Sequence, residues 1–494
     1  MSSAPASAGP SLAGRFAAAI ALTIGFYVLA LVLSLGLLAL AIVPWLTAAP
    51  QNIWLSITAL VLGGSILVAI FPRRLQFTEP GPKVTEADEP RLMGLISEEA
   101  KAAGESVPED VYLTMEINAA VMQRSRTHRV MIVGVPLLQI LSERELRGVI
   151  AHEFGHYSGG DTRLGPWIYR TRETIGRTIV QLSDDDGDDS WSQTLVRLPF
   201  IWYGNAFLRI TAAISRRQEF AADASAVRRA GRATYVAALR RVHGNAPVFD
   251  SYWMEEVVPV LDTKRRPPVG DGFCHFVGTK AIEEAAQAYL DRELQEGKTD
   301  AYDSHPSLPE RIAAIEGMPD GDPDDSPCSI ELLTDAAAAE ARVLDDLIGL
   351  DARSFKPVAW DEVGVEIYVK RAEAAAKNFP QVLDGVTLAS LPDAVERIPD
   401  TANVLRAPED DPKAAMEGVA GVLGDGVLLA LHRAGWTVEA PPGQPVWARL
   451  GDEVILPHAA VHKLWAEELS AAEWRELVQR YDVGRLPLGE RVPA

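Results

Sequence analysis

The hydrophobic pattern of this chain begins with two long uncharged segments near the N-terminus. Phe16 to Val43 is a run of 28 residues without a charged side chain, and Ile53 to Phe71 is a second run of 19 residues. As helices they would span about 42 Å and about 28 Å, whereas the hydrocarbon core of a bilayer is roughly 30 Å thick. We therefore predict a two-helix transmembrane hairpin over residues 15–75, after a disordered N-terminus at residues 1–14. The alternative, two buried helices of a soluble core, fits two adjacent uncharged runs less well.

Basic residues flank the predicted hairpin at its outer ends. Arg15 precedes the first run, Arg73 and Arg74 follow the second, and the loop between the runs carries no charge. Positively charged flanks tend to stay on the cytoplasmic side of a membrane. The sequence thus predicts a multi-pass protein of the cell membrane, with both ends of the hairpin in the cytoplasm.

After the hairpin the pattern changes to shorter amphipathic segments. Residues 89–103 have the spacing of an amphipathic helix, and residues 111–115 and 128–135 read as strands. Two longer segments, 164–182 and 191–214, are apolar but interrupted by charged residues. Charges at a bilayer centre cost several kcal/mol each, by order of magnitude. We therefore expect these two segments to be helices that lie on the membrane surface or pack over the cleft.

The strongest chemical signal is His152-Glu153-Phe154-Gly155-His156, which has the form H-E-x-x-H. Residues four apart lie on one face of an α-helix, so both imidazoles can bind one metal ion. The spacing Ser142-x-x-Glu145 upstream is that of a capping box and predicts a helix start. Zinc accepts nitrogen and carboxylate ligands, and a neighbouring glutamate can take a proton from a water at the metal. Glu153 is therefore the candidate general base.

A third ligand is expected from farther along the chain. Glu219 and Asp223 lie one helical turn apart in the stretch Arg216–Ala224. Glu219 is the candidate third metal ligand, and Asp223 can accept the outer N–H of a ligand histidine and so fix its tautomer. The alternative for Glu219 taken alone is an ordinary surface carboxylate. Asp161, just after the motif helix, is a further candidate for supporting a ligand, although an aspartate in a helix-terminal turn is the simpler interpretation.

Three motifs in this order resemble those of the HtpX-like membrane zinc metallopeptidases and their CAAX prenyl protease relatives. They are H-E-F-G-H at 152–156, R-R-Q-E-F-A-A-D-A at 216–224 and S-H-P-S-L-P-E-R-I at 304–312. The resemblance covers roughly residues 111–316 and the membrane segments before them, but not the last third of the chain. It implies one Zn²⁺ per chain, held by the two histidines and Glu219.

The same resemblance implies roles for residues that the pattern alone does not single out. The third motif would fold back toward the metal, where His305 would steady the oxyanion and act as a catalytic residue. Arg311 would brace the cleft or pair with an acidic group. A strand ahead of the metal helix would bind the substrate backbone at a sheet edge, and Arg129–Gly134 is the candidate. From the sequence itself, a plain core strand fits Arg129–Gly134 as well.

Composition and charge narrow the function classes. The chain has 494 residues and a formal net charge of −21, which argues against nucleic-acid binding because such proteins need a basic surface. Its only two cysteines, Cys274 and Cys328, exclude a disulfide framework and a cysteine zinc site, and they fit a reducing compartment. The hydrophobic fraction of 48% fits a globular or membrane-associated protein.

We predict a mainly α fold with a small β-sheet, in three parts. A zincin-type zinc metallopeptidase domain covers residues 80–316, an acidic linker rich in proline and glycine covers 317–330, and an accessory α+β domain of unknown function covers 331–494. In the accessory domain, residues 421–435 read as a helix, and residues 436–439, 446–450 and 453–456 as a small antiparallel sheet. Ser470 and Glu473 have capping-box spacing.

The predicted function is a membrane-anchored zinc endopeptidase with its catalytic domain in the cytoplasm. By family likeness its substrates would be membrane or misfolded proteins, cut at internal peptide bonds. One alternative is a CAAX-type prenyl-protein processing protease, which would need a larger intramembrane chamber. Another is a membrane-tethered scaffold or binding protein, with a structural or vestigial metal site and a protein partner on the C-terminal domain. The lipid bilayer and protein or peptide substrates are the expected partners.

Overall fold

The structure, a computed structural model, divides into two compact units. It describes residues 12–47, 52–71, 77–125, 128–158, 171, 174–175, 191–300, 302–303, 305–407 and 411–489. The first unit consists of residues 1–243 and 289–336, and the second of residues 244–288 and 337–494. This division does not follow the predicted domain boundaries, since residues 244–288 group with the C-terminal residues. Helices dominate both units and the sheets are small, which confirms the predicted fold class.

The two uncharged runs form the two long N-terminal helices. Helix α1 spans Leu12–Leu46 and α2 spans Ile53–Ile70, and both are long and apolar enough to cross a membrane. They pack closely because Gly63 of α2 faces Ser34 of α1, whose hydroxyl donates to the Gly63 carbonyl over 2.7 Å. Many of their large apolar side chains are exposed, including Trp54 with 76% of its surface. This exposure suits a lipid environment better than water.

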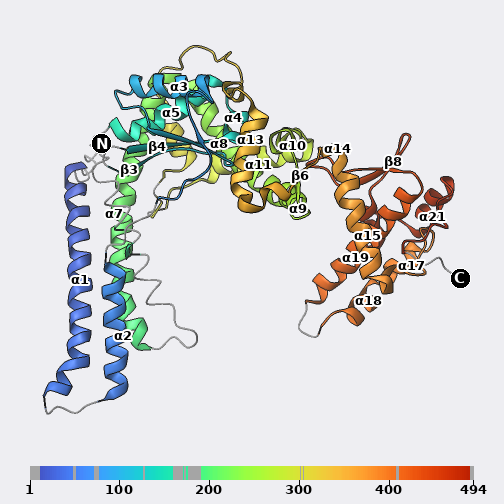
Figure 1. The fold of residues 1–494 in the computed structure, drawn as a ribbon, viewed down its shortest axis with the longest axis horizontal. Coiled ribbons are helices and arrows are strands. Elements are labelled where there is room, and N and C mark those ends of the chain that lie inside the picture. Colours follow the sequence, from blue (N-terminus) through green and yellow to red (C-terminus); the bar gives the residue numbers. More distant parts are fainter. Residues whose placement is uncertain are drawn as a thin grey trace, which may run out of the picture. The chain divides into compact units, whose positions relative to one another are not determined.

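Helix α7, Trp191–Ala230, runs alongside α1 and α2 before it reaches the rest of the unit (Figure 1). Phe200 and Phe207 of α7 are fully buried against Phe26 of α1, and the rings of Phe26 and Phe200 meet edge to face at 6.1 Å. The expectation that residues 191–214 lie on the membrane surface or over the cleft is therefore wrong, because Phe200 and Phe207 of this segment pack against the hairpin. Most of the segment 164–182 lies outside the described residues.

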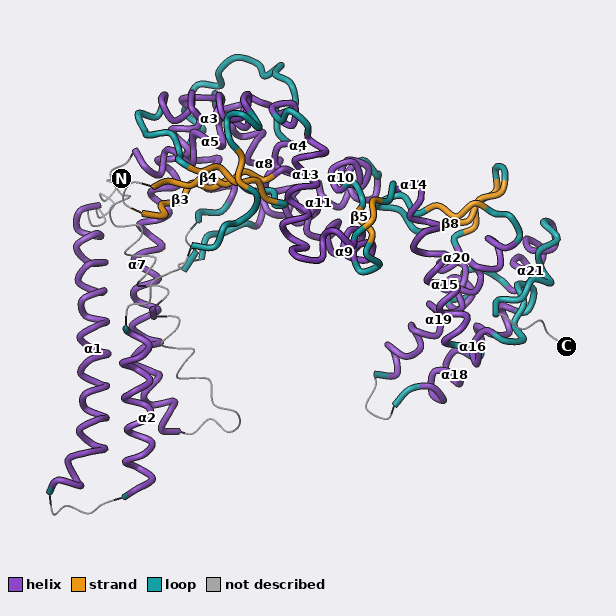
Figure 2. Tube along the Cα trace, in the orientation of Figure 1, coloured by secondary structure: helices purple, strands orange, loops and turns teal. Residues whose placement is uncertain are grey.

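A four-stranded sheet follows the hairpin. Its strands are β1 (Lys83–Val84), β2 (Asp110–Thr114), β3 (Ala119–Ser125) and β4 (His128–Gly134), in the order β1-β2-β4-β3. Figure 2 shows β3 and β4 of this sheet side by side. Strands β2 and β4 are parallel, while β3 and β4 form an antiparallel pair with a register shift between Gln123 and Ser125. The candidate edge strand Arg129–Gly134 is thus an inner strand, and the edge belongs to β3, which the sequence pattern did not reveal.

Helices surround this sheet in the first unit. They are α3 (Pro90–Ala102), α4 (Val135–Ile140), α5 (Glu143–Ser158), the first part of α8 (Arg232–Tyr252), the last part of α11 (Lys280–Glu296) and α12 (Leu308–Ala314). The short 3-10 helix Ser329–Leu332 closes the unit. Glycine 148 and Gly155 line one face of α5, so that α5 and α7 approach each other closely.

The predicted acidic linker is bound to the first unit over most of its length. We call residues 319–329 the strap. The Pro327 carbonyl accepts a hydrogen bond from the Glu143 backbone N–H over 2.8 Å. The Ser329 backbone N–H donates to the Leu141 carbonyl over 2.8 Å. The strap is therefore fastened to the start of α5, which its Gly/Pro/Asp composition did not indicate.

The second unit is an α+β body around one apolar core. Its central helix is α19 (Pro412–Arg433), whose second half is buried almost completely, as is Trp436 after it. Strands β7 (Thr437–Glu439), β8 (Trp447–Leu450) and β9 (Glu453–Ile455) form the predicted antiparallel sheet. Helix α21 (Ala471–Arg480) starts at the predicted capping box, since Ser470 and Glu473 each bond to the other's backbone. Helix α19 is apolar enough to span a membrane, but its burial suits a core helix.

The remaining elements of the second unit are short. The helices are α9 (Val258–Leu261), α10 (Val269–Val277), α13 (Ala336–Ile348), α14 (Trp360–Val363), α15 (Lys370–Asn378), α16 (Pro380–Leu383), α17 (Leu391–Glu396), α18 (Ile398–Leu405) and α20 (Pro457–Trp465). Strands β5 (Arg265–Arg266) and β6 (Lys356–Pro357) form a parallel pair.

Candidate metal centre

Helix α5 carries the H-E-x-x-H residues, and its start is built as predicted. The Glu145 carboxylate accepts from the Ser142 backbone N–H over 2.9 Å, and the Ser142 hydroxyl accepts from the Glu145 N–H over 3.1 Å. This reciprocal pair is a capping box. It fixes the first turn of α5, and the regular helix that follows places His152 and His156 on one face.

Close packing of α5 on α7 brings the third candidate to the histidines. A Cβ atom built on Gly155 would lie 2.9 Å from the Cα of Ala222 and 3.2 Å from the Cβ atoms of Ala222 and Ser225. Only glycine therefore allows the two helices to come this near. Because Glu219 is three residues before Ala222 on α7, its carboxylate reaches the His152 and His156 rings.

The three candidate ligand side chains converge on one point. The Nε2 atoms of His152 and His156 are 3.2 Å apart, and the Glu219 carboxylate oxygens lie 3.5 Å and 3.6 Å from them. All three ligand atoms lie within 4.8 Å of one another. Two atoms bound to zinc at about 2.0–2.1 Å in a tetrahedron are roughly 3.3–3.4 Å apart. The Glu219 Oε2 atom is also buried and has no hydrogen bond of standard geometry to the described residues. Spacing, donor types and this unbonded oxygen all fit a divalent metal ion.

The electrostatics of the cluster also suit a cation. Burial alone would lower the pKa of His152, but its contacts with Asp223 and Glu219 outweigh burial and raise that pKa to about 9. Burial and the neighbouring His152 lower the pKa of His156 to about 4. Burial would raise the pKa of Glu219, yet the contacts with His152 and His305 hold it well below its usual range. The cluster thus keeps an ionised carboxylate beside a site that favours positive charge.

A buried network supports the outer side of His152. Asp223 is completely buried, and its Oδ1 atom lies 3.0 Å from Nδ1 of His152. Arg311 of α12, also buried, donates to both Asp223 carboxylate oxygens over 2.6 Å and 3.1 Å. Tyr235 of α8 donates to Asp223 over 2.7 Å, and its oxygen lies 2.9 Å from Nδ1 of His152. The sequence-predicted residues Asp223 and Arg311 are therefore joined directly, and Nδ1 of His152 faces oxygen atoms.

This network assigns the tautomer of His152. A tyrosine hydroxyl has one hydrogen to donate, and Tyr235 gives it to Asp223. The Tyr235 oxygen then accepts from Arg311 over 3.0 Å and from Nδ1 of His152. As a metal ligand His152 must be neutral, and with its remaining proton on Nδ1 it would present a lone pair at Nε2, the atom that points to His156 and Glu219.

His305 lies at the open side of the cluster. Its Nδ1 atom is 3.0 Å from Glu219, and 70% of its side-chain surface is exposed. The contact with Glu219 raises the pKa of His305. Arg216 of α7 holds the segment before His305, because its guanidinium donates to the carbonyls of Asp303 and Asp300 over 2.7 Å and 3.3 Å.

Glu153 lies between α5 and the edge strand of the sheet. Its carboxylate accepts from the Val121 backbone N–H of β3 over 3.4 Å, and the side chain is half-buried. Burial raises the pKa of Glu153. A carboxyl group with a raised pKa holds a proton more readily, which is useful for a group that accepts and returns one.

Two groups near the site were not expected from the sequence. Tyr235 carries no local signal that separates it from any other core aromatic residue. Glu99 of α3 is buried and binds Arg147 of α5 over 2.7 Å and Arg229 of α7 over 2.6 Å and 2.8 Å. This carboxylate joins the two helices that carry the candidate ligands. Asp161 lies outside the described residues, so its predicted role stays a prediction.

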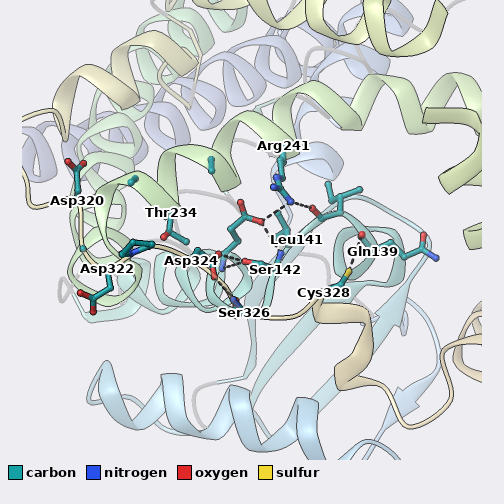
Figure 3. Close-up of a pocket in the computed structure, with 16 residues that line it drawn as sticks. Gln139, Leu141, Ser142, Thr234, Arg241, Asp320, Asp322, Asp324, Ser326 and Cys328 are labelled. Carbon is teal, nitrogen blue, oxygen red and sulfur yellow. Dashed lines mark hydrogen bonds and ion pairs between the residues drawn. The ribbon is translucent and has the colours of Figure 1, made fainter. Parts of the chain in front are cut away.

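A hollow of about 680 Å³ lies away from the cluster, between the start of α5, α8 and the strap (Figure 3). Its lining includes Ser142, Thr234, Arg241, Asp324 and Ser326, but none of the candidate metal ligands. The close-up shows Ser142 and Asp324 next to each other in its wall, where the Ser142 hydroxyl donates to the Asp324 carboxylate. The hollow therefore marks where the strap meets α5 and α8, and the chemistry lies elsewhere.

Comparisons with known proteins agree with this geometry. Residues 86–319 match the family model for peptidase family M48. The Protease HtpX of Cronobacter sakazakii is 29% identical over 201 residues, which is 36% of this chain and 69% of that protein. The Protease HtpX of Escherichia fergusonii is 26% identical over 265 residues, 49% of this chain and 84% of that protein. The matched region contains the three motifs and both helices of the metal cluster. Residues 86–319 of this chain are therefore similar to the HtpX-like metallopeptidases of family M48.

Proposed function

We propose that this protein is a membrane-anchored zinc endopeptidase that cleaves internal peptide bonds at the cytoplasmic face. The observation that carries the proposal is the convergence of His152, His156 and Glu219 at separations of 3.2–3.6 Å, with Glu153 on the same helix. A metallopeptidase is already supported by the family match. The proposal adds that the metal is zinc, that internal peptide bonds are cleaved and that cleavage takes place at the cytoplasmic face.

Zinc suits the donor set better than other common divalent ions. Two imidazole nitrogens and one carboxylate oxygen leave a fourth position open, which is the pattern of catalytic zinc sites, whereas magnesium and calcium prefer oxygen ligands alone. His152, His156 and Glu219 would hold one zinc ion per chain. When bound, zinc lowers the pKa of a water molecule and polarises the scissile carbonyl group.

The remaining chemistry falls to residues of the chain. Glu153 accepts the proton of the attacking water and passes it to the leaving amine, so it serves as base and then as acid. His305, exposed beside Glu219, is suited to donate a hydrogen bond to the oxygen that becomes negatively charged. Strand β3 is an edge strand whose Val121 N–H points toward Glu153, so a substrate backbone can add to this edge.

The membrane location rests on α1 and α2 together with the charges around them. Both helices are long and apolar enough to span a bilayer, and arginines flank their outer ends. This supports a catalytic domain on the cytoplasmic side. Membrane proteins and misfolded proteins that reach this face are the proposed substrates.

The test is the variant Glu153→Gln of the full chain, purified in detergent and assayed on an unfolded protein substrate. We expect one zinc per chain in both proteins and a loss of at least about 100-fold in cleavage rate for the variant. Glu283→Gln, an exposed substitution on α11, is the matched control. Chelation should abolish wild-type cleavage, and added Zn²⁺ should restore it. The proposal would be contradicted if Glu153→Gln cleaved the substrate at the wild-type rate, or if the wild-type chain bound no zinc.

A further inference from the structure

We propose that Tyr235 is a positioning residue for the metal ligand His152 and that the strap holds Tyr235 in place. The inference rests on the proposed zinc site. It adds that the geometry of one ligand is set by a tyrosine hydroxyl and by a segment outside the three sequence motifs.

The Tyr235 hydroxyl is built into the support of His152. The side chain is 1% exposed, and its ring lies nearly parallel to the His152 ring, with centroids 6.2 Å apart and an interplanar angle of 27°. The hydroxyl oxygen lies 2.9 Å from Nδ1 of His152 and donates to Asp223 over 2.7 Å. Asp223 and Tyr235 therefore share the Nδ1 proton, and the imidazole is held from two directions.

The Tyr235 ring can lie close to α5 because Gly148 of α5 has no side chain. A Cβ atom on Gly148 would lie 3.3 Å from a ring carbon of Tyr235. Gly148 is four residues before His152, on the same face of α5. Any shift of α8 along this face would therefore change the position of the hydroxyl relative to His152.

The strap fixes the start of α8 at Arg232, three residues before Tyr235. The carbonyls of Pro319 and Asp320 accept from the Arg232 and Ala233 N–H groups over 2.9 Å and 3.2 Å. These are the first N–H groups of α8, which otherwise lack partners within the helix. The Tyr235 N–H closes the first helical turn by donating to the Gly231 carbonyl over 3.0 Å.

Two glycines allow the strap to come so near. Gly231 has φ +89° and Gly321 has φ +79°, and a Cβ atom on Gly321 would lie 2.8 Å from the Cα of Gly231. Figure 3 shows the strap residues Asp320 and Asp322 on the same side of the hollow as Thr234 of α8. A side chain at position 321 would push the strap away from the first turn of α8.

The first experiment compares Tyr235→Phe with Tyr252→Phe in the full chain. Tyr252 is an equally buried tyrosine whose hydroxyl donates to the Val269 carbonyl over 2.8 Å, in the other unit. Zinc affinity is measured by competition with a chromophoric chelator, and folding by thermal unfolding. We expect Tyr235→Phe to bind zinc about 10- to 100-fold more weakly, as is typical when a group supporting a ligand is lost. Tyr252→Phe should keep the wild-type affinity.

The outcomes separate this inference from the proposed function. If the wild-type chain binds zinc and Tyr235→Phe binds it within twofold of wild type, the positioning role is overturned and the peptidase proposal stands. If the wild-type chain has no zinc affinity, both are overturned. Equal losses in Tyr235→Phe and Tyr252→Phe would also overturn the positioning role.

The second experiment tests the strap through Gly321→Ala. Gly104→Ala is the matched control, because Gly104 has φ +71° but no atom within 4 Å of an added Cβ. We expect Gly321→Ala to weaken zinc binding in the wild-type background and to add little in the Tyr235→Phe background, since both changes act through one hydroxyl. An equal weakening in both backgrounds, or none in either, would overturn the role of the strap.

Discussion

The substitution Gly155→Ala should open the metal centre without unfolding the protein. An alanine Cβ at this position would lie 2.9 Å from the Cα of Ala222 and 3.2 Å from two Cβ atoms on α7. Carbon atoms in good contact are about 3.5–4.0 Å apart, so α5 and α7 must separate by roughly 0.5–1 Å. The two imidazoles move with α5 while Glu219 moves with α7. The distances from the Glu219 carboxylate oxygens to Nε2 of His152 and of His156, now 3.5 Å and 3.6 Å, would then exceed about 4 Å. Such a change is larger than the roughly 0.2 Å by which metal–ligand distances can vary.

The cost to folding should be small compared with the cost to function. Overpacking costs about 1–3 kcal/mol, and replacing glycine by alanine inside a helix returns about 1 kcal/mol. A net loss of about 0–2 kcal/mol leaves the protein folded. A misplacement of about 1 Å can lower the rate about 100-fold. We therefore expect a folded variant with strongly reduced zinc affinity and cleavage.

The assay measures zinc affinity, cleavage rate and thermal unfolding in the same preparation. Gly94→Ala is the control, because Gly94 is an exposed glycine within α3 and an added Cβ meets nothing within 4 Å. The control should be as active as wild type and equally or slightly more stable. Adding Ala222→Gly to Gly155→Ala should restore part of the zinc affinity. The reasoning is refuted if Gly155→Ala binds zinc and cleaves substrate like the wild type.

Three further substitutions test other parts of the structure. His305→Ala should lower kcat about 100- to 1,000-fold with little change in zinc affinity, because the proposed role of this exposed side chain is to bind the developing oxyanion; steady-state kinetics with metal analysis check this. Arg311→Ala leaves the buried Asp223 carboxylate without its ion pair, so the free energy of unfolding should fall by about 3–5 kcal/mol, measured by denaturant titration. Burial would raise the pKa of Asp425, but His458 and Arg371 together outweigh burial and lower that pKa from 3.8. Its stabilisation is therefore present above pH 3.8 and lost as the pH falls through the lowered value, so Asp425→Asn should flatten the acid limb of the unfolding profile.

Local spacing predicted the parts of the site that lie on one helix. Because His152 and His156 are four residues apart, a helix alone places both rings on one face. The capping-box spacing of Ser142 and Glu145 predicted that helix. The family motifs pointed to Glu219, Asp223 and Arg311. Their convergence depends on the close approach of α5 and α7, of which the sequence gives a trace in Gly148 and Gly155 on one face of α5.

Other features could not be predicted because their signals are not local. Strand β3 has the sequence A-A-V-M-Q-R-S, which lacks a regular alternation, and its pairing with β4 decides its structure. Residues 317–330 have the composition of a loose connection, but the bonds that fasten the strap are made by its backbone, which composition does not reveal. The charges in residues 191–214 suggested a surface position, although Phe200 and Phe207 are buried against the hairpin.

Helix α7 has a practical consequence for anyone who wants this peptidase in solution. Phe200, packed against the hairpin, and Glu219, at the metal cluster, lie 19 residues apart on one unbroken helix, about 28 Å along its axis. A truncated chain that begins at residue 77 would keep every proposed zinc ligand, but it would strip the apolar lower half of α7 of its partners. Removing α1 and α2 therefore exposes an apolar surface on the same helix that carries Glu219. Detergent or lipid would then remain necessary even for the truncated chain.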